Sequence, residues 1–293
     1  MKSRLRAYLS LTKPTIGLLV IITGATALVM EGSMLASPAR VVLFLFGLFL
    51  TAGSASAFNM YLEREIDAQM TRTAKKRPLA NGTLPASHGL VFAISIGVAG
   101  VVILGVFFNL LAALLGLGTI LFYSFFYTLW LKPRTPLNIV IGGAAGAMGP
   151  IIAWAAATGG LAMESWVLFM IIFCWTPPHF WALAYCLKED YKTVQYPMMP
   201  IVRGDTETLR QIFLYTLVTV AFTLSLAFFD VGVLYIAFAV GLGAVFVWLV
   251  RELMRTRETR SAWKLFGYSI VYLLFLFVIL MIDQAMPYQP WKG

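Results

Sequence analysis

Nine runs of about twenty mostly apolar residues constrain this chain more than any other feature of its sequence. A helix needs roughly 20 apolar residues to cross the ~30 Å hydrocarbon core of a bilayer. The shorter alternating segments of a transmembrane β-barrel are not present in the sequence. We therefore predict an all-α integral membrane protein with about nine transmembrane helices. The predicted spans lie near Pro14–Met30, Val41–Leu62, Leu90–Phe108, Leu110–Leu131, Leu137–Ala157, Trp166–Leu187, Leu209–Phe229, Val231–Val250 and Leu265–Ile282.

The composition excludes the main soluble alternatives. Hydrophobic residues make up 60% of the 293 residues and charged residues only 12%, whereas about 25% of a typical soluble domain is charged. A chain this apolar has no reason to stay hydrated, so disorder is excluded as well. Two cysteines are too few for a disulfide scaffold or a cysteine-based zinc site. We expect a single transmembrane domain over residues 1–293.

The placement of the basic residues predicts the orientation of the spans. In a soluble domain the net charge of +9 would suggest nucleic acid as a partner, but here it follows the membrane topology. If the N-terminus is cytoplasmic, 20 of the 22 Lys and Arg residues fall on the cytoplasmic side, and only Arg40 and Lys292 do not. The C-terminus is then outside, and nine of the 13 acidic residues face the cytoplasm. We expect a bacterial cytoplasmic (inner) membrane and no nucleic-acid partner.

The first constellation that could carry chemistry ends the second span. Asn59, Glu63 and Asp67 are spaced four residues apart, which places them on one face of a helix. Oxygen ligands on one face, open to water at one end, suit Mg²⁺, which binds substrate phosphates through one or two carboxylates. The plainer alternative is an ordinary polar helix end. The position of Asn59 inside the apolar zone favours a functional role.

Basic residues follow this constellation and also end the fourth span. The loop after Asp67 carries Arg72 and, just before Pro78, Arg77. This loop is either a simple positive-inside loop or a cationic clamp for an anionic substrate. Lys132 and Arg134 occupy the corresponding end of the fourth span, where they could also meet a diphosphate.

The third constellation lies in the sixth predicted span. Pro177 and Pro178 are expected to break or kink this helix and to expose its backbone next to His179. A histidine there could contact or ligate haem, or could take part in proton transfer or diphosphate binding. Glu189 and Asp190, about three turns further on, form a second acidic cluster.

A weak internal repeat has an offset of 122 residues. Pro14 matches Pro136, and the segment Pro78–Gly82 matches Pro200–Gly204. If the repeat is real, the two long cytoplasmic loops are counterparts and could meet across a shared cavity. Chance similarity is the alternative.

Two further features of the sequence bear on helix packing and on the possible classes of function. The Gly-rich and Ala-rich stretch Gly142–Pro150 favours close helix packing over the lining of a channel. The sequence has no phosphate-binding loop of the Walker type, no dinucleotide fingerprint and no serine nucleophile elbow. A nucleotide-driven pump is therefore not expected.

These motifs resemble a known family. The stretch 59–82 is similar to the first acidic motif of the intramembrane aromatic prenyltransferase superfamily. Two later stretches, Tyr127–Ala147 and Pro177–Gly204, resemble one branch of it, the protoheme IX farnesyltransferases. The similarity runs from about residue 13 to residue 204, and its most branch-specific part is the string Pro177–Ala184.

The resemblance implies a fold, a reaction and a set of ligands. The helices would surround a central cavity that opens to the cytoplasmic side. Farnesyl diphosphate, held through Mg²⁺, would transfer its farnesyl group to a vinyl group of haem B and give haem O. The partners that the resemblance implies are farnesyl diphosphate, haem B and the lipid bilayer. It also implies a complex with haem A synthase or oxidase assembly factors.

The resemblance also implies roles for individual residues. Metal–diphosphate binding and catalysis fall to Asn59, Glu63 and Asp67, with Glu189 and Asp190 as weaker metal ligands. His179 is assigned to the porphyrin. The residues that could bind either diphosphate or haem propionates are Arg64, Arg72, Arg77, Tyr127, Lys132, Arg134 and Lys192.

The sequence departs from the family pattern at the acidic motifs. The family usually has Asp where this chain has Glu63 and Glu65, so the carboxylates remain but extend one methylene further. His179 stands where other members begin their second acidic motif with Asp, which leaves a second metal site poorer in carboxylates. Three other functions stay open: a prenyltransferase acting on a quinone or another aromatic acceptor, a secondary transporter, and a non-catalytic oxidase assembly factor.

Overall fold

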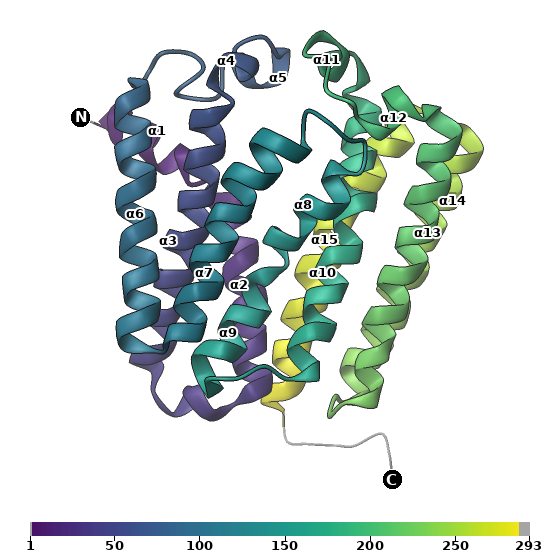
Figure 1. Ribbon diagram of the computed structural model, residues 1–293. Helices are drawn as coiled ribbons and strands as arrows, with labels where there is room; N and C mark the ends of the chain where they lie inside the picture. The colour runs from purple at the N-terminus through teal and green to yellow at the C-terminus, as the bar shows by residue number, and fades with distance from the viewer. Residues whose placement is uncertain (1, 287–293) are drawn as a thin grey trace.

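The computed structural model describes residues 2–286, and this part of the chain is built from helices that stand side by side (Figure 1). Nine helical segments in it are long and apolar enough to cross a membrane, which confirms the predicted fold class. These spans are α2 (Pro14–Glu31), α3 (Pro38–Leu62), α6 (Ala86–Phe107), α7 with η2 (Leu110–Leu121 and Phe122–Leu131), α8 with α9 (Asn138–Gly146 and Met148–Thr158), α10 (Met163–Cys186), α13 with η3 (Gly204–Ser225 and Leu226–Phe228), α14 (Val233–Thr256) and α15 (Thr259–Ala285).

Apolar side chains cover the outside of the bundle as well as its core. Val42, Val106 and Leu110 expose 67%, 71% and 70% of their surface. Lipid tails solvate such side chains, so this exposure carries no penalty in a bilayer. The spans extend a few residues beyond the apolar runs; the last helix, for example, begins at Thr259 instead of near Leu265. Polar residues can continue a helix beyond the hydrocarbon core because its backbone bonds are internal.

Glycines allow α3 and α6 to pack closely along their length. A Cβ atom on Gly97 would lie 2.5 Å from the Ser54 hydroxyl, and one on Gly100 would lie 3.0 Å from the Gly47 carbonyl oxygen and from the Thr51 amide nitrogen. Without a hydrophobic driving force between helices in lipid, such close approach supplies the packing energy.

We expect Gly100→Ala to lower the free energy of unfolding by about 1–3 kcal/mol, because its methyl group meets backbone atoms that cannot move away. Thermal unfolding of the purified protein in detergent measures this effect. The matched control is Gly118→Ala on α7, where nothing lies within 4 Å of the added carbon. Equal melting temperatures for the two variants would contradict this account of the α3–α6 contact.

The small residues of the fifth span pack against three neighbouring elements. Added Cβ atoms would meet the Tyr127 ring at Gly142, the Thr176 side chain at Gly143, and the Thr23 hydroxyl at Gly149. The prediction of close packing is confirmed at these positions. The span is interrupted at Ala147, which lies between α8 and α9 with φ −88° and ψ −5°.

The sixth span is continuous, so a break at Pro177 and Pro178 is wrong, while the kink expected as its alternative stays a prediction. Both prolines lie inside α10, which runs without interruption from Met163 to Cys186. Two prolines remove only their own two amide donors, and proline is tolerated in membrane-spanning helices that pack against neighbouring helices. This helix is the most enclosed of the nine spans found in residues 2–286, with 78% of its apolar window buried.

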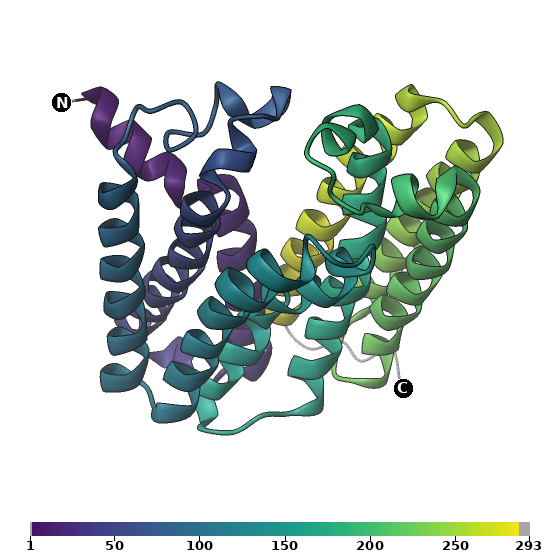
Figure 2. The ribbon, with the colours of Figure 1, turned by 45° about the horizontal axis from the view of Figure 1, so that its top comes forward.

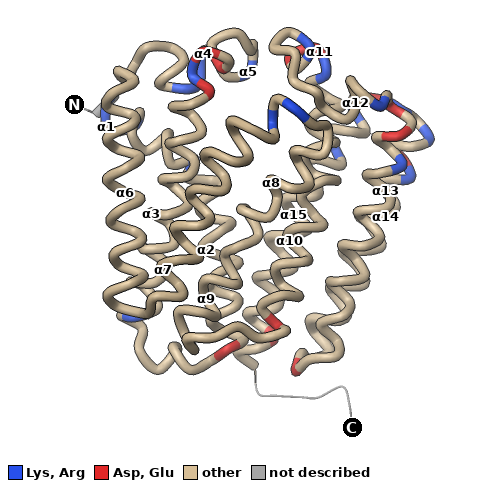
Figure 3. Tube along the Cα trace, in the orientation of Figure 1, with Lys and Arg blue, Asp and Glu red and all other residues tan. Residues whose placement is uncertain are grey.

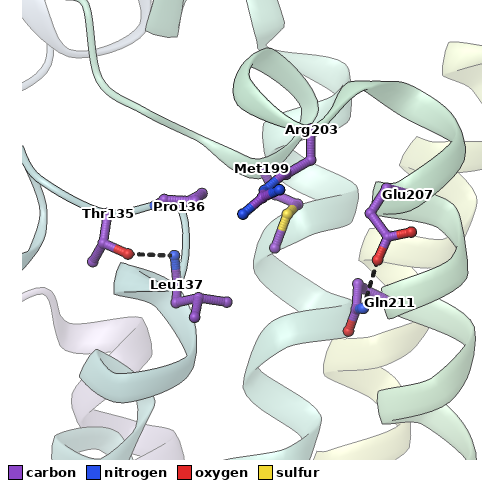
Figure 4. A pocket seen from close by; sticks show the side chains of 7 residues that line it. All are labelled: Thr135, Pro136, Leu137, Met199, Arg203, Glu207 and Gln211. Atoms are coloured by element: carbon purple, nitrogen blue, oxygen red, sulfur yellow. Dashed lines mark hydrogen bonds between the residues drawn. The ribbon is translucent and has the colours of Figure 1, made fainter.

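Five short helices gather at one end of the bundle, which we call the loop end. They are α1 (Lys2–Leu11), α4 (Arg64–Asp67), α5 (Thr71–Ala74), α11 (Lys188–Thr193) and α12 (Met199–Val202). Figure 2 shows α4 and α5 facing α11 across this end. Most Lys and Arg residues of the described chain lie here (Figure 3), as the topology predicts. Lys292, which was expected on the other side, lies outside the described residues.

The two long loops meet at the loop end, as they could if the repeat is real, while the repeat itself stays a prediction. The backbone amide of Arg72 donates to Asp190 Oδ2 at 3.2 Å, and the Tyr196 hydroxyl donates to Glu63 Oε1 at 3.2 Å. The glycines that the repeat aligns, Gly82 and Gly204, have φ of +74° and +78°. Both therefore adopt the left-handed conformation that favours glycine.

A π-helix ends the fourth span. Residues Phe122–Leu131 form η2, in which the Thr128 hydroxyl and the Lys132 amide bond to the carbonyls five residues earlier, at Tyr123 and Tyr127. Wider helical turns change the direction in which the following side chains point, and they occur often at functional sites. Here the π-helix brings Thr128 and Lys132 to the end of α3.

Candidate active site

Two buried carboxylates lie where α3 ends at the loop end. Glu63 is the residue after the last turn of α3, Asp67 ends the short helix α4, and each exposes only 2% of its surface. Arg77 Nη1 pairs with Asp67 Oδ2 and lies 3.5 Å from Glu63 Oε2. Lys132 Nζ pairs with Glu63 Oε1. One guanidinium nitrogen thus contacts both carboxylates, so the two acids share one site.

Asn59 joins this site from the last turn of α3. Its side chain is 2% exposed, accepts a hydrogen bond from Lys13 Nζ at 3.0 Å and donates to the Thr128 hydroxyl at 3.2 Å. Lys13 precedes α2 in a left-handed conformation with φ 48°. A side chain other than glycine is uncommon there, and such strain is concentrated at functional sites.

Tyr196 closes the site from the loop between α11 and α12. Besides the hydrogen bond to Glu63, its ring lies 4.9 Å from Lys132 Nζ, in cation–π geometry. Burial, together with the Glu63 carboxylate, raises the pKa of the Tyr196 hydroxyl. The hydroxyl therefore stays protonated and acts as a donor.

The charges in this site favour an anionic ligand. Burial would raise the pKa of Glu63, but Lys132, Arg77 and Lys13 together lower it, so this carboxylate is ionised. Burial raises the pKa of Asp67 despite the neighbouring Arg77. Burial and Arg77 lower the pKa of Lys13 to about 7. An arriving anion would favour the ammonium form of Lys13, because opposite charge stabilises the ionised group.

The donor atoms of this site fit a magnesium ion that also binds substrate phosphate. Asn59, Glu63 and Asp67 offer only oxygen ligands, which Mg²⁺ prefers, and the substrate and water can complete an octahedral shell. The described residues contain no group of three His, Cys, Asp or Glu side chains that could hold a metal alone. A metal here would therefore depend on oxygen atoms of the ligand.

The predicted second acidic cluster is not part of this group. Glu189 pairs with Lys192 at 2.7 Å and has an 81% exposed side chain, while Asp190 accepts from the Arg72 amide. Both lie in a separate cleft at the loop end. Their role as metal ligands stays a prediction.

The predicted basic residues divide into two groups. Arg77 and Lys132 contact the buried carboxylates, and Tyr127 is packed nearby against Gly142. The other four lie apart from Glu63 and Asp67. Arg64 pairs with Glu65, and Arg134 donates to the carbonyls of Leu129 and Trp130. Lys192 pairs with Glu189, and the Arg72 side chain lines the separate cleft.

His179 lies deeper in the bundle, on α10. It is 8% exposed, and its Nδ1 atom lies 2.7 Å from the Ser269 hydroxyl on α15. Its ring stacks between Trp175 and Phe266, with centroids 4.5 and 4.6 Å away. These contacts fix the orientation of the imidazole. Its assignment to the porphyrin stays a prediction.

Sequence reasoning missed four residues that complete these sites. Lys13, Thr128 and Tyr196 contact the acidic group from segments 46 to 133 residues away in the chain. Ser269 contacts His179 from 90 residues away. The one available signal was a lysine directly before the first apolar run, next to Pro14. Nothing in the sequence marked the other three.

Comparisons with known proteins identify the family to which this chain is similar. The UbiA prenyltransferase family matches residues 19–279. A protoheme IX farnesyltransferase of Gloeobacter violaceus is 45% identical over 288 residues, which cover 97% of this chain and 93% of that protein. One of Roseiflexus sp. (strain RS-1) is 43% identical over 284 residues. That match covers 97% of this chain but only 53% of the relative, so the chain spans about half of the relative's length.

Solved structures share the fold. A structure of digeranylgeranylglyceryl phosphate synthase matches with a TM-score of 0.79 at 16% identity, covering 96% of this chain and 99% of that one. A UbiA homologue from Archaeoglobus fulgidus, bound to DMAPP and Mg²⁺, matches with a TM-score of 0.70 at 14% identity, covering 93% and 98%. Identities this low show the fold alone. The match of the family model over residues 19–279 establishes that the chain belongs to the UbiA prenyltransferase family.

Proposed function

We propose that this chain is a protoheme IX farnesyltransferase, which transfers the farnesyl group of farnesyl diphosphate to a vinyl group of haem B and gives haem O. The observation that carries the proposal is the buried pair Glu63 and Asp67, surrounded by Arg77, Lys132 and Lys13. Acids that can hold a metal beside cations that can hold phosphate suit an enzyme that cleaves a diphosphate ester. The relatives named above support the choice of haem as acceptor.

The first step is the release of diphosphate. Asn59, Glu63 and Asp67 would hold Mg²⁺, which stabilises negative charge on the leaving group. Arg77 and Lys132 neutralise the same charge from the side of the carboxylates, and they can exchange a carboxylate partner for a phosphate oxygen. The C1–O bond of farnesyl diphosphate then breaks and its electron pair leaves with the diphosphate.

The second step joins the two substrates. The terminal carbon of the vinyl group forms a bond to C1 of the allylic cation, and the positive charge moves to the carbon beside the porphyrin ring. Water adds there and loses a proton, which gives the hydroxyethylfarnesyl chain. Asn59, Glu63 and Asp67 each expose only 2% of their surface. This burial keeps bulk water from the first cation.

The proposal includes the membrane and the orientation in which the protein works. We place the loop end at the cytoplasmic side of a bacterial inner membrane, because positive loops remain there. The N-terminus is then cytoplasmic and the C-terminus outside. Haem A synthase and oxidase assembly factors are the protein partners that this reaction implies.

The proposal is tested by incubating the purified protein with haem B, farnesyl diphosphate and Mg²⁺ and analysing the porphyrins by mass. We expect haem O, and no product when Mg²⁺ is removed by a chelator. A product formed only from a phenolic acid or quinone precursor would mean that the enzyme prenylates an acceptor other than haem. No prenylated product from any of these acceptors would overturn the proposal.

A further inference from the structure

A second charged cleft lies at the loop end, separate from the site of Glu63 and Asp67. It has a volume of about 640 Å³ and lies where both long loops meet the turn between α14 and α15. Its basic residues are Arg72, Lys76, Lys188 and Arg257, and its acidic residues are Glu189, Asp190 and Asp205. We call it the propionate cleft.

The acidic residues of the cleft are already engaged, whereas most of its basic residues are not. Asp205 pairs with Lys188 at 2.8 Å, Glu189 pairs with Lys192, and Asp190 accepts from the backbone amide of Arg72. The side chains of the three other cations, Arg72, Lys76 and Arg257, form no ion pair within the described residues. Arg72 Nε is also buried without a hydrogen-bond partner. An unsatisfied buried donor of this kind is costly unless a ligand completes it.

The backbone holds Arg257 at this cleft in an unusual conformation. Arg257 has φ 55°, in the left-handed region, and its carbonyl accepts a hydrogen bond from the Tyr185 hydroxyl at 2.9 Å. A residue other than glycine persists there only when its surroundings fix it. Tyr185, in the last turn of α10, supplies that constraint, so Arg257 is held at the wall of the cleft.

The cleft and His179 both involve helix α10. Cys186 lines the cleft, and His179 precedes it by seven residues, or two helical turns. The two residues therefore lie on the same face of α10, about 10 Å apart along its axis. This separation is comparable with the width of a porphyrin, whose two carboxylates lie on the edge opposite one of its vinyl groups.

We infer that this cleft binds the two propionate carboxylates of the haem acceptor, with Arg72, Lys76 and Arg257 as their cationic partners. The inference rests on the proposed function and divides the basic residues between the substrates. Arg77, Lys132 and Lys13 serve the diphosphate, and the three cations of the propionate cleft serve the porphyrin. Guanidinium groups suit carboxylates because they can bind both oxygens at once.

The test compares ligands with and without the carboxylates. Ferric haem B and its dimethyl ester are titrated into the purified protein in detergent, and binding is followed by absorbance and by quenching of tryptophan fluorescence. We expect the wild type to bind haem B at least about tenfold more tightly than the diester, the loss expected for one charged hydrogen bond. Arg257→Gln and Lys76→Gln should each weaken haem B binding about tenfold and leave diester binding unchanged.

Three controls show whether the effect is specific to the propionate cleft. Arg260→Gln changes an exposed arginine in the first turn of α15 that does not line the cleft, and should bind both ligands as the wild type does. Arg257→Lys should restore part of the preference for haem B. Binding of inorganic diphosphate, measured by calorimetry, should be the same in Arg257→Gln and the wild type.

The outcomes separate this inference from the proposed function. Equal affinity of the wild type for haem B and the diester overturns the propionate assignment alone, provided that haem O is still formed. Weaker diphosphate binding by Arg257→Gln, with haem B binding intact, makes the cleft a diphosphate site and also overturns it. Absence of both haem binding and haem O formation overturns the two proposals together.

Discussion

Replacing Asp67 by asparagine is expected to lower farnesyl transfer about 1000-fold. Asparagine keeps the shape of the side chain but removes the negative charge that would hold the metal, whose contribution amounts to several kcal/mol. Asp67 is well placed for this role because its backbone carbonyl accepts a bond from the Thr73 hydroxyl at 2.7 Å, which fixes α4 against the following loop. The rate of haem O formation at saturating substrates measures the effect.

Glu65→Gln is the matched control for this variant. Glu65 lies on the same short helix, but its side chain is 79% exposed and pairs with Arg64. Its replacement should leave the rate within about twofold of the wild type, since exposed ion pairs contribute little. A rate for Asp67→Asn close to that of Glu65→Gln would remove Asp67 from the catalytic group.

Replacing Lys132 by methionine is expected to lower kcat about 100-fold. Lys132 contacts Glu63 and lies over the Tyr196 ring, and the π-helix η2 directs it to this position. A positioned cation that stabilises charge on a leaving group is worth at least as much as a weak oxyanion-hole donor, about 2.7 kcal/mol. Single-turnover measurement of haem O formation separates this effect from substrate binding.

Lys264→Met controls for the loss of a lysine from an ion pair at the loop end. Lys264 pairs with Glu252 at 3.1 Å and is 49% exposed. It should leave both kcat and the melting temperature nearly unchanged. Lys132→Arg should recover more activity than Lys132→Met, because it keeps the charge. If Lys132→Met and Lys264→Met have the same kcat, Lys132 does not stabilise the leaving group.

The spans were predictable because apolar length is a property of each segment alone. A run of about 20 apolar residues has few options in a membrane, so neither the number of helices nor their order depended on contacts between them. The break expected at Pro177 and Pro178 shows where such local reasoning ends. The prolines are compatible with a helix because α10 is enclosed by its neighbours.

The acidic group was predicted from helical spacing even though the helix does not continue through it. Glu63 has φ −95° and ψ 5°, which separates α3 from α4. Asp67 nevertheless returns to Glu63 because both contact Arg77. Local spacing therefore placed the carboxylates on one side, and the basic loop brought them together.

The cations of the site could not be divided by sequence. Lys132 and Arg134 are two residues apart and have similar charge, but only Lys132 reaches Glu63, while Arg134 donates to carbonyls of its own helix. The distinction depends on the wider turns of η2, which no periodicity in the sequence reveals. Lys13 and Tyr196 enter the site through loop conformations and contacts between distant segments.

Binding of Mn²⁺, followed by electron paramagnetic resonance in the presence of farnesyl diphosphate and without haem, tests the central assignment most directly. Manganese takes the oxygen ligands that suit magnesium. The wild type should bind Mn²⁺ only when farnesyl diphosphate is present, and the double variant Glu63→Gln, Asp67→Asn should bind at least about tenfold more weakly while still binding haem. Equal binding of Mn²⁺ by the double variant and the wild type would contradict the assignment of these two carboxylates to the metal–diphosphate complex.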